Sequence, residues 1–316
     1  MKILCITPIN HIKGLVKNLE NIGELDIFEN PSITDLVGIV DDYDVIFTNP
    51  NKSKVYIGED LLKNAKKIQY ICTASTGTVH IDKEYLAKRG IKILSLTKEL
   101  EIIEKISSTA EHAFALMMTS LRKIIPAQDS VKNKIWDYEP FIGRQMNKLN
   151  ILVVGFGRLG KKFAHYCNAF DANIFVYDPY VEADSIYTQV HDMTEILNTI
   201  DIISLHVHVT EETKNLINKP LFDKCKSDVI IINTSRGEII NESHAIEFLK
   251  KNENARIATD VLSGEIFGFQ NSELYKFSEH SNQVLITPHI AGMTTDAQEI
   301  AYNHAAKMLS NEININ

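Results

Sequence analysis

The chain has 316 residues, and its 33 Lys and Arg against 41 Asp and Glu give a net charge of −8. At roughly 100–200 residues per domain, this length predicts two domains, each with its own core. The acidic balance argues against nucleic acid or an anionic membrane as the main partner, because phosphate binding rests on clustered basic charge. The longest apolar runs have the length of strands, so we expect no segment that spans a membrane.

The four cysteines, Cys5, Cys72, Cys167 and Cys225, lie far apart and form no CxxC pair. This spacing favours a reduced protein without disulfides or structural zinc. The N-terminal apolar run turns polar at once and lacks the small-residue cleavage site of a signal peptide. We therefore expect a cytoplasmic protein.

Short apolar runs alternate with stretches of helical periodicity along the chain. The predicted strands are residues 3–7, 45–48, 68–74, 91–96, 151–154, 174–177, 202–205, 229–233, 257–260 and 284–287. The predicted helices include residues 82–89, 107–122, 161–170, 242–251 and 294–310. Buried continuous runs joined by helices are typical of parallel sheets. We predict an α/β fold with doubly wound parallel sheets.

A glycine motif follows the predicted strand 151–154 and precedes a predicted helix. Gly155, Gly157 and Gly160 form GxGxxG. In this context the first glycine allows a tight turn, the second lets a pyrophosphate approach the backbone, and the third permits close packing of helix and strand. The amides at the start of the helix would then meet the phosphates. The motif predicts dinucleotide binding, and the alternative is a glycine-rich turn without a ligand.

Asp178 ends the next predicted strand, 18 residues after Gly160. A carboxylate there accepts hydrogen bonds from ribose hydroxyls and repels a 2′-phosphate, which favours NAD over NADP. No Arg or Lys stands in the residues that follow, 179–184, to accommodate NADP. The alternative is an Asp that only caps the turn before Pro179.

Later strands end in segments rich in polar residues: INTSRGEII around Arg236, ATDVLSGE from Asp260 to Glu265, and ITPHIAG around His289. Together with STGTVHID (75–82), SSTAEHA (107–113) and the glycine motif, they make the chain resemble the D-2-hydroxyacid dehydrogenase family. The resemblance covers nearly the whole chain. It implies an enzyme that interconverts a 2-keto acid and its D-2-hydroxy acid with NAD as cofactor.

The resemblance implies roles for three residues in catalysis. Arg236 would hold the substrate carboxylate, which a guanidinium grips with two parallel hydrogen bonds. His289 would exchange a proton with the substrate oxygen, and Glu265 would orient the imidazole. Singly, each residue has an ordinary alternative: a surface ion pair for Arg236, a solvated turn for Glu265, and a buried, satisfied histidine for His289.

The resemblance also implies binding residues and a domain layout. Ser75, Thr76 and Gly77 would bind the substrate. Besides the glycines and Asp178, the expected cofactor contacts are Thr109, Arg158, Leu159, His206, Thr234 and Asp260. The NAD-binding domain would be residues 104–291, inserted into a substrate domain made of residues 1–103 and 292–316. A homodimer is expected, formed through the 107–122 region and the arm near Trp136.

Several positions depart from the family pattern. Val79 and His80 replace an Asp-Asn pair, His208 stands where Pro is usual, and Ile266 replaces the Pro that often follows the catalytic Glu. His206 and His208 alternate along the chain and raise the alternative of a metal site, but the sequence offers no third ligand and we expect none. These changes surround the expected pocket and leave Arg236, Glu265 and His289 intact, so they bear on the choice of substrate and not on the class of reaction.

Two other functions stay open on the sequence. One is a dinucleotide-sensing interaction protein similar to the corepressors of the family. The other is formate or phosphite oxidation at the same site. The intact Arg236, Glu265 and His289 favour the hydroxyacid dehydrogenase reaction over the sensing role.

Overall fold

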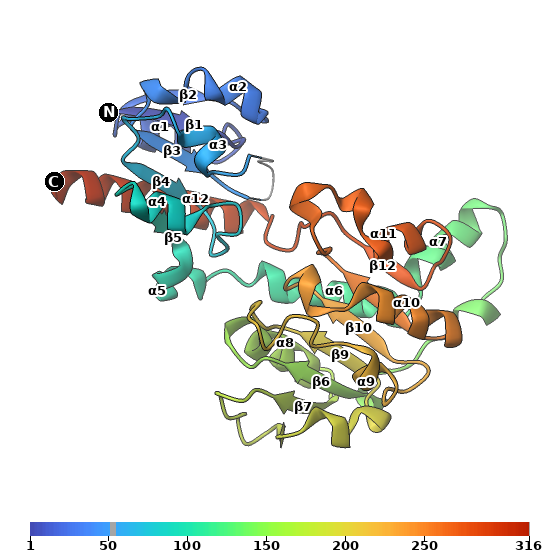
Figure 1. Cartoon of the computed structure of the whole chain (residues 1–316). Coiled ribbons are helices and arrows are strands. Elements are labelled where there is room, and N and C mark those ends of the chain that lie inside the picture. Colours follow the sequence, from blue (N-terminus) through green and yellow to red (C-terminus); the bar gives the residue numbers. More distant parts are fainter. Residues whose placement is uncertain (51–54, 316) are drawn as a thin grey trace. The chain divides into compact units, whose positions relative to one another are not determined.

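The computed structural model describes residues 1–50 and 55–315. The chain forms two compact units, one of Met1–Ile106 with Gly292–Asn316 and one of Ser107–Ala291. Each unit has one parallel β-sheet with helices packed against it (Figure 1). The predicted α/β class with parallel sheets is confirmed.

The first unit has a five-stranded sheet in the order β2-β1-β3-β4-β5. Its strands are β1 (Lys2–Cys5), β2 (Glu24–Ile27), β3 (Val45–Thr48), β4 (Tyr70–Thr73) and β5 (Lys92–Ser95). Its helices are α1 (Leu15–Glu20), α2 (Ile33–Val37), α3 (Glu59–Leu62), α4 (Lys83–Lys88), α5 (Leu100–Ile103) and α12 (Thr295–Ile315).

The sheet of the first unit is buried on both faces, which explains its continuous apolar strands. Along β3, Val45 and Phe47 join one apolar cluster, and Ile46 between them joins the other. This alternation follows from the two-residue period of a strand. The C-terminal helix α12 belongs to the first cluster, where Tyr302 lies against Phe47 with ring centroids 6.2 Å apart. The buried face of α12 therefore packs against the same side of the sheet as residues of β1 and β3.

The second unit has a seven-stranded sheet in the order β12-β11-β10-β9-β6-β7-β8. Its strands are β6 (Asn150–Val154), β7 (Asn173–Tyr177), β8 (Thr188–Val190), β9 (Ile202–Leu205), β10 (Ile230–Asn233), β11 (Arg256–Thr259) and β12 (Val284–Ile286). Its helices are α6 (Ser108–Leu121), α7 (Ile124–Lys132), α8 (Arg158–Asn168), α9 (Lys219–Phe222), α10 (Glu242–Lys251) and α11 (Glu273–Ser278).

The order of this second sheet contains one reversal of direction. From β6 the chain adds β7 and β8 on one side, and then crosses back to place β9 on the other side of β6. The carboxyl ends of β6 and β9 therefore flank a topological switch point, which is where open α/β sheets bind ligands. Gly155 follows β6 and His206 follows β9, so the glycine motif lies at this point.

Every predicted strand is present, but the sequence analysis missed β2 and β8. Both are edge strands of their sheets and are only partly buried, so neither produces a continuous apolar run. It also missed α7, whose large apolar residues are exposed, so the helix has no buried apolar face. Within the described part of the chain, no helix has the length and apolar character that crossing a membrane requires.

Candidate active site

The turn between β6 and α8 is built around its glycines. Gly155 has a φ of 91°, and a Cβ there would lie 2.7 Å from the carbonyl oxygen of His206. A Cβ on Gly160 would lie 2.0 Å from the carbonyl oxygen of Gly155. A Cβ on Gly157, in contrast, would meet nothing within 4 Å. The first and third glycines are thus required by packing, whereas the second leaves open space beside the first turn of α8, where Arg158 and Leu159 lie.

This open space fits the pyrophosphate of a dinucleotide. Among the described residues, no atom lies within 4 Å of a Cβ placed on Gly157, and the amides of the first turn of an α-helix have no partner within the helix. The helix N-terminus also carries partial positive charge, which suits an anion. The residues present therefore fit the cofactor that the glycine motif predicts.

Asp178 lies at the end of β7 and holds two turns together. One carboxylate oxygen accepts a hydrogen bond from the amide of Phe156 at 2.7 Å. The other accepts from the amides of Tyr180 at 2.8 Å and Val181 at 3.0 Å. Asp178 therefore caps the turn after β7, which was the alternative to a ribose contact in the sequence analysis, and it also braces the glycine loop, which that analysis did not foresee.

His206 offers its backbone, and not its ring, to the glycine loop. Its imidazole Nε2 is 2.9 Å from the hydroxyl of Ser204, and its ring lies on Phe163 of α8 with centroids 5.0 Å apart. Burial lowers the pKa of His206 to about 3, so the ring is neutral. His208 is exposed. Among the described residues, no group of three or more His, Cys, Asp or Glu is arranged to hold a metal ion.

Arg236 lies in a turn after β10 that is fixed by its neighbours. The side chain of Asn233 donates to the Arg236 carbonyl oxygen at 2.9 Å and accepts from the Ser235 amide at 3.0 Å. The Ser235 hydroxyl donates to the carbonyl oxygen of Leu205 at 2.7 Å. One guanidinium nitrogen of Arg236 donates to the Ser235 carbonyl oxygen at 2.6 Å. Thr234 in the same turn is buried.

Glu265 and His289 are directly hydrogen-bonded, Oε1 to Nδ1. A carboxylate only accepts, so the proton of this bond belongs to Nδ1 of His289. The second oxygen of Glu265 accepts from the Leu262 amide at 2.9 Å, which fixes the carboxylate within its own turn. Both side chains are partly exposed, 30% for His289 and 23% for Glu265, so a small molecule can reach them.

Asp260 fixes the backbone that carries His289. Its carboxylate accepts from the amides of Ile290 at 2.9 Å and Ala291 at 2.8 Å, and its carbonyl oxygen accepts from the His289 amide at 2.9 Å. These bonds hold the backbone of His289 at a φ of 54°, in the left-handed region that residues other than glycine rarely adopt. Asp260 is only 1% exposed, and its bonds fix the loop that carries His289. The sequence analysis had expected Asp260 to contact the cofactor.

The charge of Asp260 is maintained by donors from two directions. Burial would raise its pKa, but hydrogen bonds from His112, Thr287 and the amides of Ala291 and Ile290 bring the pKa below its ordinary value. The Thr287 hydroxyl donates its one proton to Asp260 at 2.5 Å. His112 Nε2, which is 2.9 Å from that hydroxyl oxygen, must therefore donate a hydrogen bond to it. His112 of α6 thus supports the strand end through Thr287, and the sequence analysis missed it.

The expected substrate residues lie in the first unit, in the loop after β4. The Ser75 hydroxyl donates to the Gly77 carbonyl oxygen at 2.7 Å and lies 2.8 Å from the Thr73 hydroxyl. The Thr76 carbonyl oxygen accepts from the Thr97 hydroxyl at 2.9 Å. These bonds shape the loop. Thr109 lies in the second unit, half-buried in the first turn of α6.

Residues 114–291 match the family model described as "D-isomer specific 2-hydroxyacid dehydrogenase, NAD binding domain". The chain belongs to this family. Its resemblance to the D-2-hydroxyacid dehydrogenases is thereby confirmed, as is NAD as the cofactor of the matched domain.

Relatives of the D-2-hydroxyacid dehydrogenase family match most of this chain. The D-3-phosphoglycerate dehydrogenase of Archaeoglobus fulgidus is 33% identical over 301 residues, which are 94% of this chain and 54% of the relative. That of Synechocystis is 31% identical over 283 residues, 89% of this chain and 49% of the relative. The chain therefore spans about half the length of these curated relatives.

Solved structures share the fold at lower identity. The apo-structure of D-lactate dehydrogenase from Escherichia coli has a TM-score of 0.83 and 24% identity, and the match covers 99% of this chain and 97% of that one. D-lactate dehydrogenase from Aquifex aeolicus, complexed with NAD and lactic acid, has a TM-score of 0.79 and 24% identity, with 99% and 96% covered. At this identity the likeness shows the fold.

Proposed function

We propose that this chain is an NAD-dependent oxidoreductase that interconverts a 2-keto acid and its D-2-hydroxy acid. The observation that carries the proposal is the hydrogen bond between Glu265 and His289, within the unit that contains the NAD binding domain. A histidine that has one ring nitrogen hydrogen-bonded to a carboxylate is the arrangement used for proton transfer in acid–base catalysis.

When bound, the nicotinamide cofactor supplies or accepts the hydride at C2 of the substrate. The chain's own residues do the rest. Arg236 binds the planar carboxylate of the keto acid. His289 donates a proton from Nε2 to the carbonyl oxygen as it gains negative charge, and it takes the proton back in the reverse direction. Glu265 holds the Nδ1–H and stabilises the charged ring.

We assign the remaining expected residues to binding. Gly155, Gly157, Gly160 and the first turn of α8 would hold the pyrophosphate. Asp178 would accept from the ribose hydroxyls in addition to its backbone bonds. Ser75, Thr76 and Gly77 would offer backbone amides to the substrate carboxylate, which makes the first unit the substrate domain and the second the cofactor domain.

A panel of 2-keto acids with NADH tests this function through the loss of NADH absorbance. We expect turnover of at least one keto acid, and a loss on the order of a hundredfold or more in kcat in His289→Ala, because general acid catalysis typically contributes that much. His165→Ala, on the exposed side of α8, is the matched control. Undiminished activity of His289→Ala would refute the proton-transfer role. NADH binding without turnover of any keto acid would refute the enzyme and favour a sensing role, and oxidation of formate or phosphite would change the substrate class.

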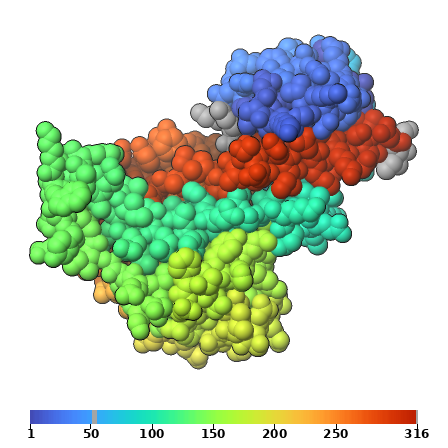
Figure 2. All heavy atoms as spheres, turned by 180° about the vertical axis from the view of Figure 1, so that it is seen from behind, coloured from blue at the N-terminus to red at the C-terminus, as the bar shows by residue number. Residues whose placement is uncertain are grey.

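We further propose a homodimer in a reducing compartment. The segment 124–142, which includes α7, extends from the second unit (green in Figure 2). It exposes seven large apolar side chains: Ile124, Ile125, Val131, Ile135, Trp136, Tyr138 and Ile142. A patch of this kind is typical of a surface that another protein covers, and a second copy of this chain is the partner that the family resemblance implies. The four cysteines are all free thiols, which suits the cytoplasm.

A further inference from the structure

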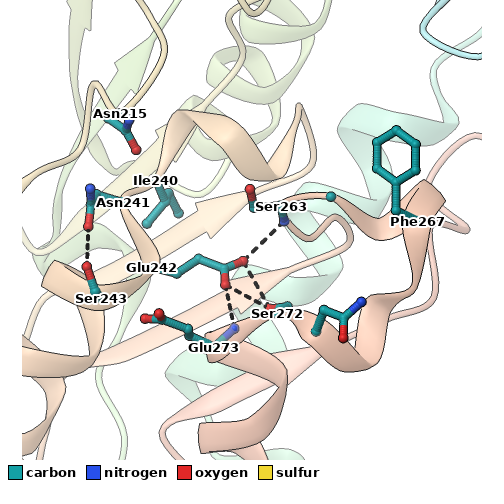
Figure 3. A pocket seen from close by; sticks show the side chains of 11 residues that line it. Asn215, Ile240, Asn241, Glu242, Ser243, Ser263, Phe267, Ser272 and Glu273 are labelled. Carbon is teal, nitrogen blue, oxygen red and sulfur yellow. Dashed lines mark hydrogen bonds between the residues drawn. The ribbon is translucent and has the colours of Figure 1, made fainter.

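Glu242, the first residue of α10, is bonded to both ends of the loop that carries Glu265. One of its oxygens accepts from the Ser263 amide at 3.1 Å. The other accepts from the Glu273 amide at 2.7 Å and the Leu274 amide at 3.3 Å. The Ser272 hydroxyl donates to the same carboxylate, 2.9 Å from one oxygen and 3.0 Å from the other. Figure 3 shows Glu242 between Ser263 on one side and Ser272 and Glu273 on the other.

The middle of this loop has little packing of its own. Ile266, Phe267 and Phe269 are exposed, and the backbone turns at Gly264 with a φ of 67° and at Gly268 with a φ of 125°. Both ends of the loop line a pocket of about 390 Å³, and Asn215, Asn241 and Ser243 form part of its wall (Figure 3). Besides the packing of Phe269 on Tyr275, with ring centroids 5.0 Å apart, hydrogen bonds at the two ends of the loop contribute to its position.

The anchor at Ser263 stands two residues before Glu265. Glu265 reaches His289 only while its own turn is in place, because its second oxygen is bonded to the Leu262 amide within that turn. A nearby carboxylate adds little to this anchoring, since Glu238 accepts from the Gly264 amide only at 3.4 Å. Glu242 is thus the side chain that ties the turn of Glu265 to the rigid start of α10.

We propose that Glu242 is a positioning residue for the Glu265–His289 pair: it joins the two ends of the loop so that the Glu265 carboxylate stays on the imidazole. This inference rests on the proposed function. It requires a carboxylate at position 242, because three amides and one hydroxyl all donate to it. A glutamine would turn an NH₂ group toward donors and leave at least one of them without an acceptor.

The test compares Glu242→Gln with Glu265→Gln, with the double variant, and with Glu247→Gln as the matched control. Glu247 is on the same helix and makes only an exposed ion pair with Lys219, so its change removes the same charge without touching the loop. We expect kcat of keto-acid reduction to fall on the order of tenfold to a hundredfold in Glu242→Gln, since small displacements of a catalytic group cost that much. The KM for NADH should stay within about twofold, because the glycine loop is unchanged.

The pH profile separates positioning from mere structural support. In Glu265→Gln the imidazolium loses its carboxylate, so the alkaline limb of kcat/KM should move to lower pH. Glu242→Gln should move the limb in the same direction, and the double variant should move it no further than Glu265→Gln alone, because coupled residues are not additive. Ser272→Ala, which removes one donor to Glu242, should give a smaller shift of the same sign.

An unmoved alkaline limb in Glu242→Gln, or effects that simply add in the double variant, would overturn the positioning role, even if the thermal stability falls. If Glu265→Gln itself leaves the profile and kcat unchanged, the proposed function fails and not the anchoring alone. The two failures are therefore distinguishable in one set of measurements.

Discussion

Gly237 lies directly against the peptide bond between Leu262 and Ser263: a Cβ on Gly237 would stand 2.0 Å from the Leu262 carbonyl carbon and 2.1 Å from the Ser263 nitrogen. This contact presses the turn of Arg236 onto the loop of Glu265. Gly237→Ala should therefore separate the two turns and lower the free energy of unfolding by about 1–3 kcal/mol, the usual effect of overpacking. Urea unfolding and the KM for the keto acid measure the two consequences. Gly38→Ala is the control, because its Cβ would meet nothing within 4 Å, and an equal effect there would contradict the explanation.

The second and third glycines of the motif, Gly157 and Gly160, should respond differently to substitution by alanine. Gly157→Ala adds a Cβ in open space, so the fold should keep its thermal stability while NADH binding weakens on the order of tenfold or more, because the methyl group lies where a pyrophosphate approaches. Gly160→Ala meets the Gly155 carbonyl oxygen, so it should lower stability as well. Calorimetric titration with NADH and thermal melts separate the effects. Unchanged NADH affinity in a folded Gly157→Ala variant would argue against the assigned phosphate position.

Asp178→Asn tests the preference for NAD over NADP. The asparagine can keep an acceptor for Tyr180 and Val181, which share one carboxylate oxygen, while it removes the negative charge. We expect the ratio of NADPH to NADH activity to rise at least about fivefold, since two unit charges 4 Å apart in water repel by about 1 kcal/mol. Steady-state rates with both cofactors measure the ratio. The same ratio in the variant and the parent would show that Asp178 acts only as a brace.

His80 should make the protein less stable in acid. Burial lowers the pKa of His80 to about 4 from an ordinary value of 6.5. In the unfolded chain His80 binds a proton below about pH 6.5, whereas in the folded chain it binds one only near pH 4. The contribution of His80 to the free energy of unfolding is therefore complete above pH 6.5 and is lost as the pH falls from 6.5 to 4. The loss is on the order of 3 kcal/mol.

Urea unfolding at pH 7.5, 6 and 5 measures this loss, with His80→Asn as the test variant. The variant should flatten the pH dependence, and His191→Asn, on the surface of the second unit, should not. His206, whose pKa burial lowers to about 3, should supply part of the remaining slope. A slope that His80→Asn leaves unaltered would contradict the assignment.

Trp136 should report directly on dimer formation. It is the only tryptophan of the sequence, and its side chain is 92% exposed in the single chain. If a second copy covers the segment 124–142, the fluorescence emission of Trp136 should shift to shorter wavelength as the protein concentration rises. Trp136→Ser should raise the dissociation constant of the dimer by about thirtyfold or more, as expected for a buried aromatic anchor. Light scattering gives the mass, and Val37→Ser in the first unit is the control. A monomer at working concentrations would refute the dimer.

The strands and the glycine turn could be predicted because their signals are local. Val45–Thr48 and Ile202–Leu205 are mostly apolar because both faces of their sheets are covered, and the spacing of Gly155 and Gly160 reflects the close approach of Gly160 to the Gly155 carbonyl oxygen within one turn. The support of His289 could not be predicted in this way. Its network joins Asp260 to Thr287, and Thr287 to His112, which is 175 positions away in the chain.

Glu242 was missed for a related reason. At the first turn of a helix an acidic residue is the ordinary choice, because it complements the helix dipole. Nothing in its immediate sequence distinguishes such a residue from one whose carboxylate reaches Ser263 and Ser272. Family resemblance identified the residues that would touch the substrate, and the structure adds those that hold them.

Arg236, Glu265, His289 and the glycine motif all belong to one uninterrupted segment, Ser107–Ala291, whereas the unit that carries Ser75–Gly77 is assembled from two. On the proposed function, the residues that bind the cofactor and those that transfer the proton are therefore encoded in one continuous segment of the chain. A recombination event with crossovers near residues 106 and 292 would transfer this whole segment. The loop Ser75–Gly77, which on the same proposal also contacts the substrate, would not be transferred, so such an exchange would alter one part of the substrate site and keep the proposed catalytic residues together.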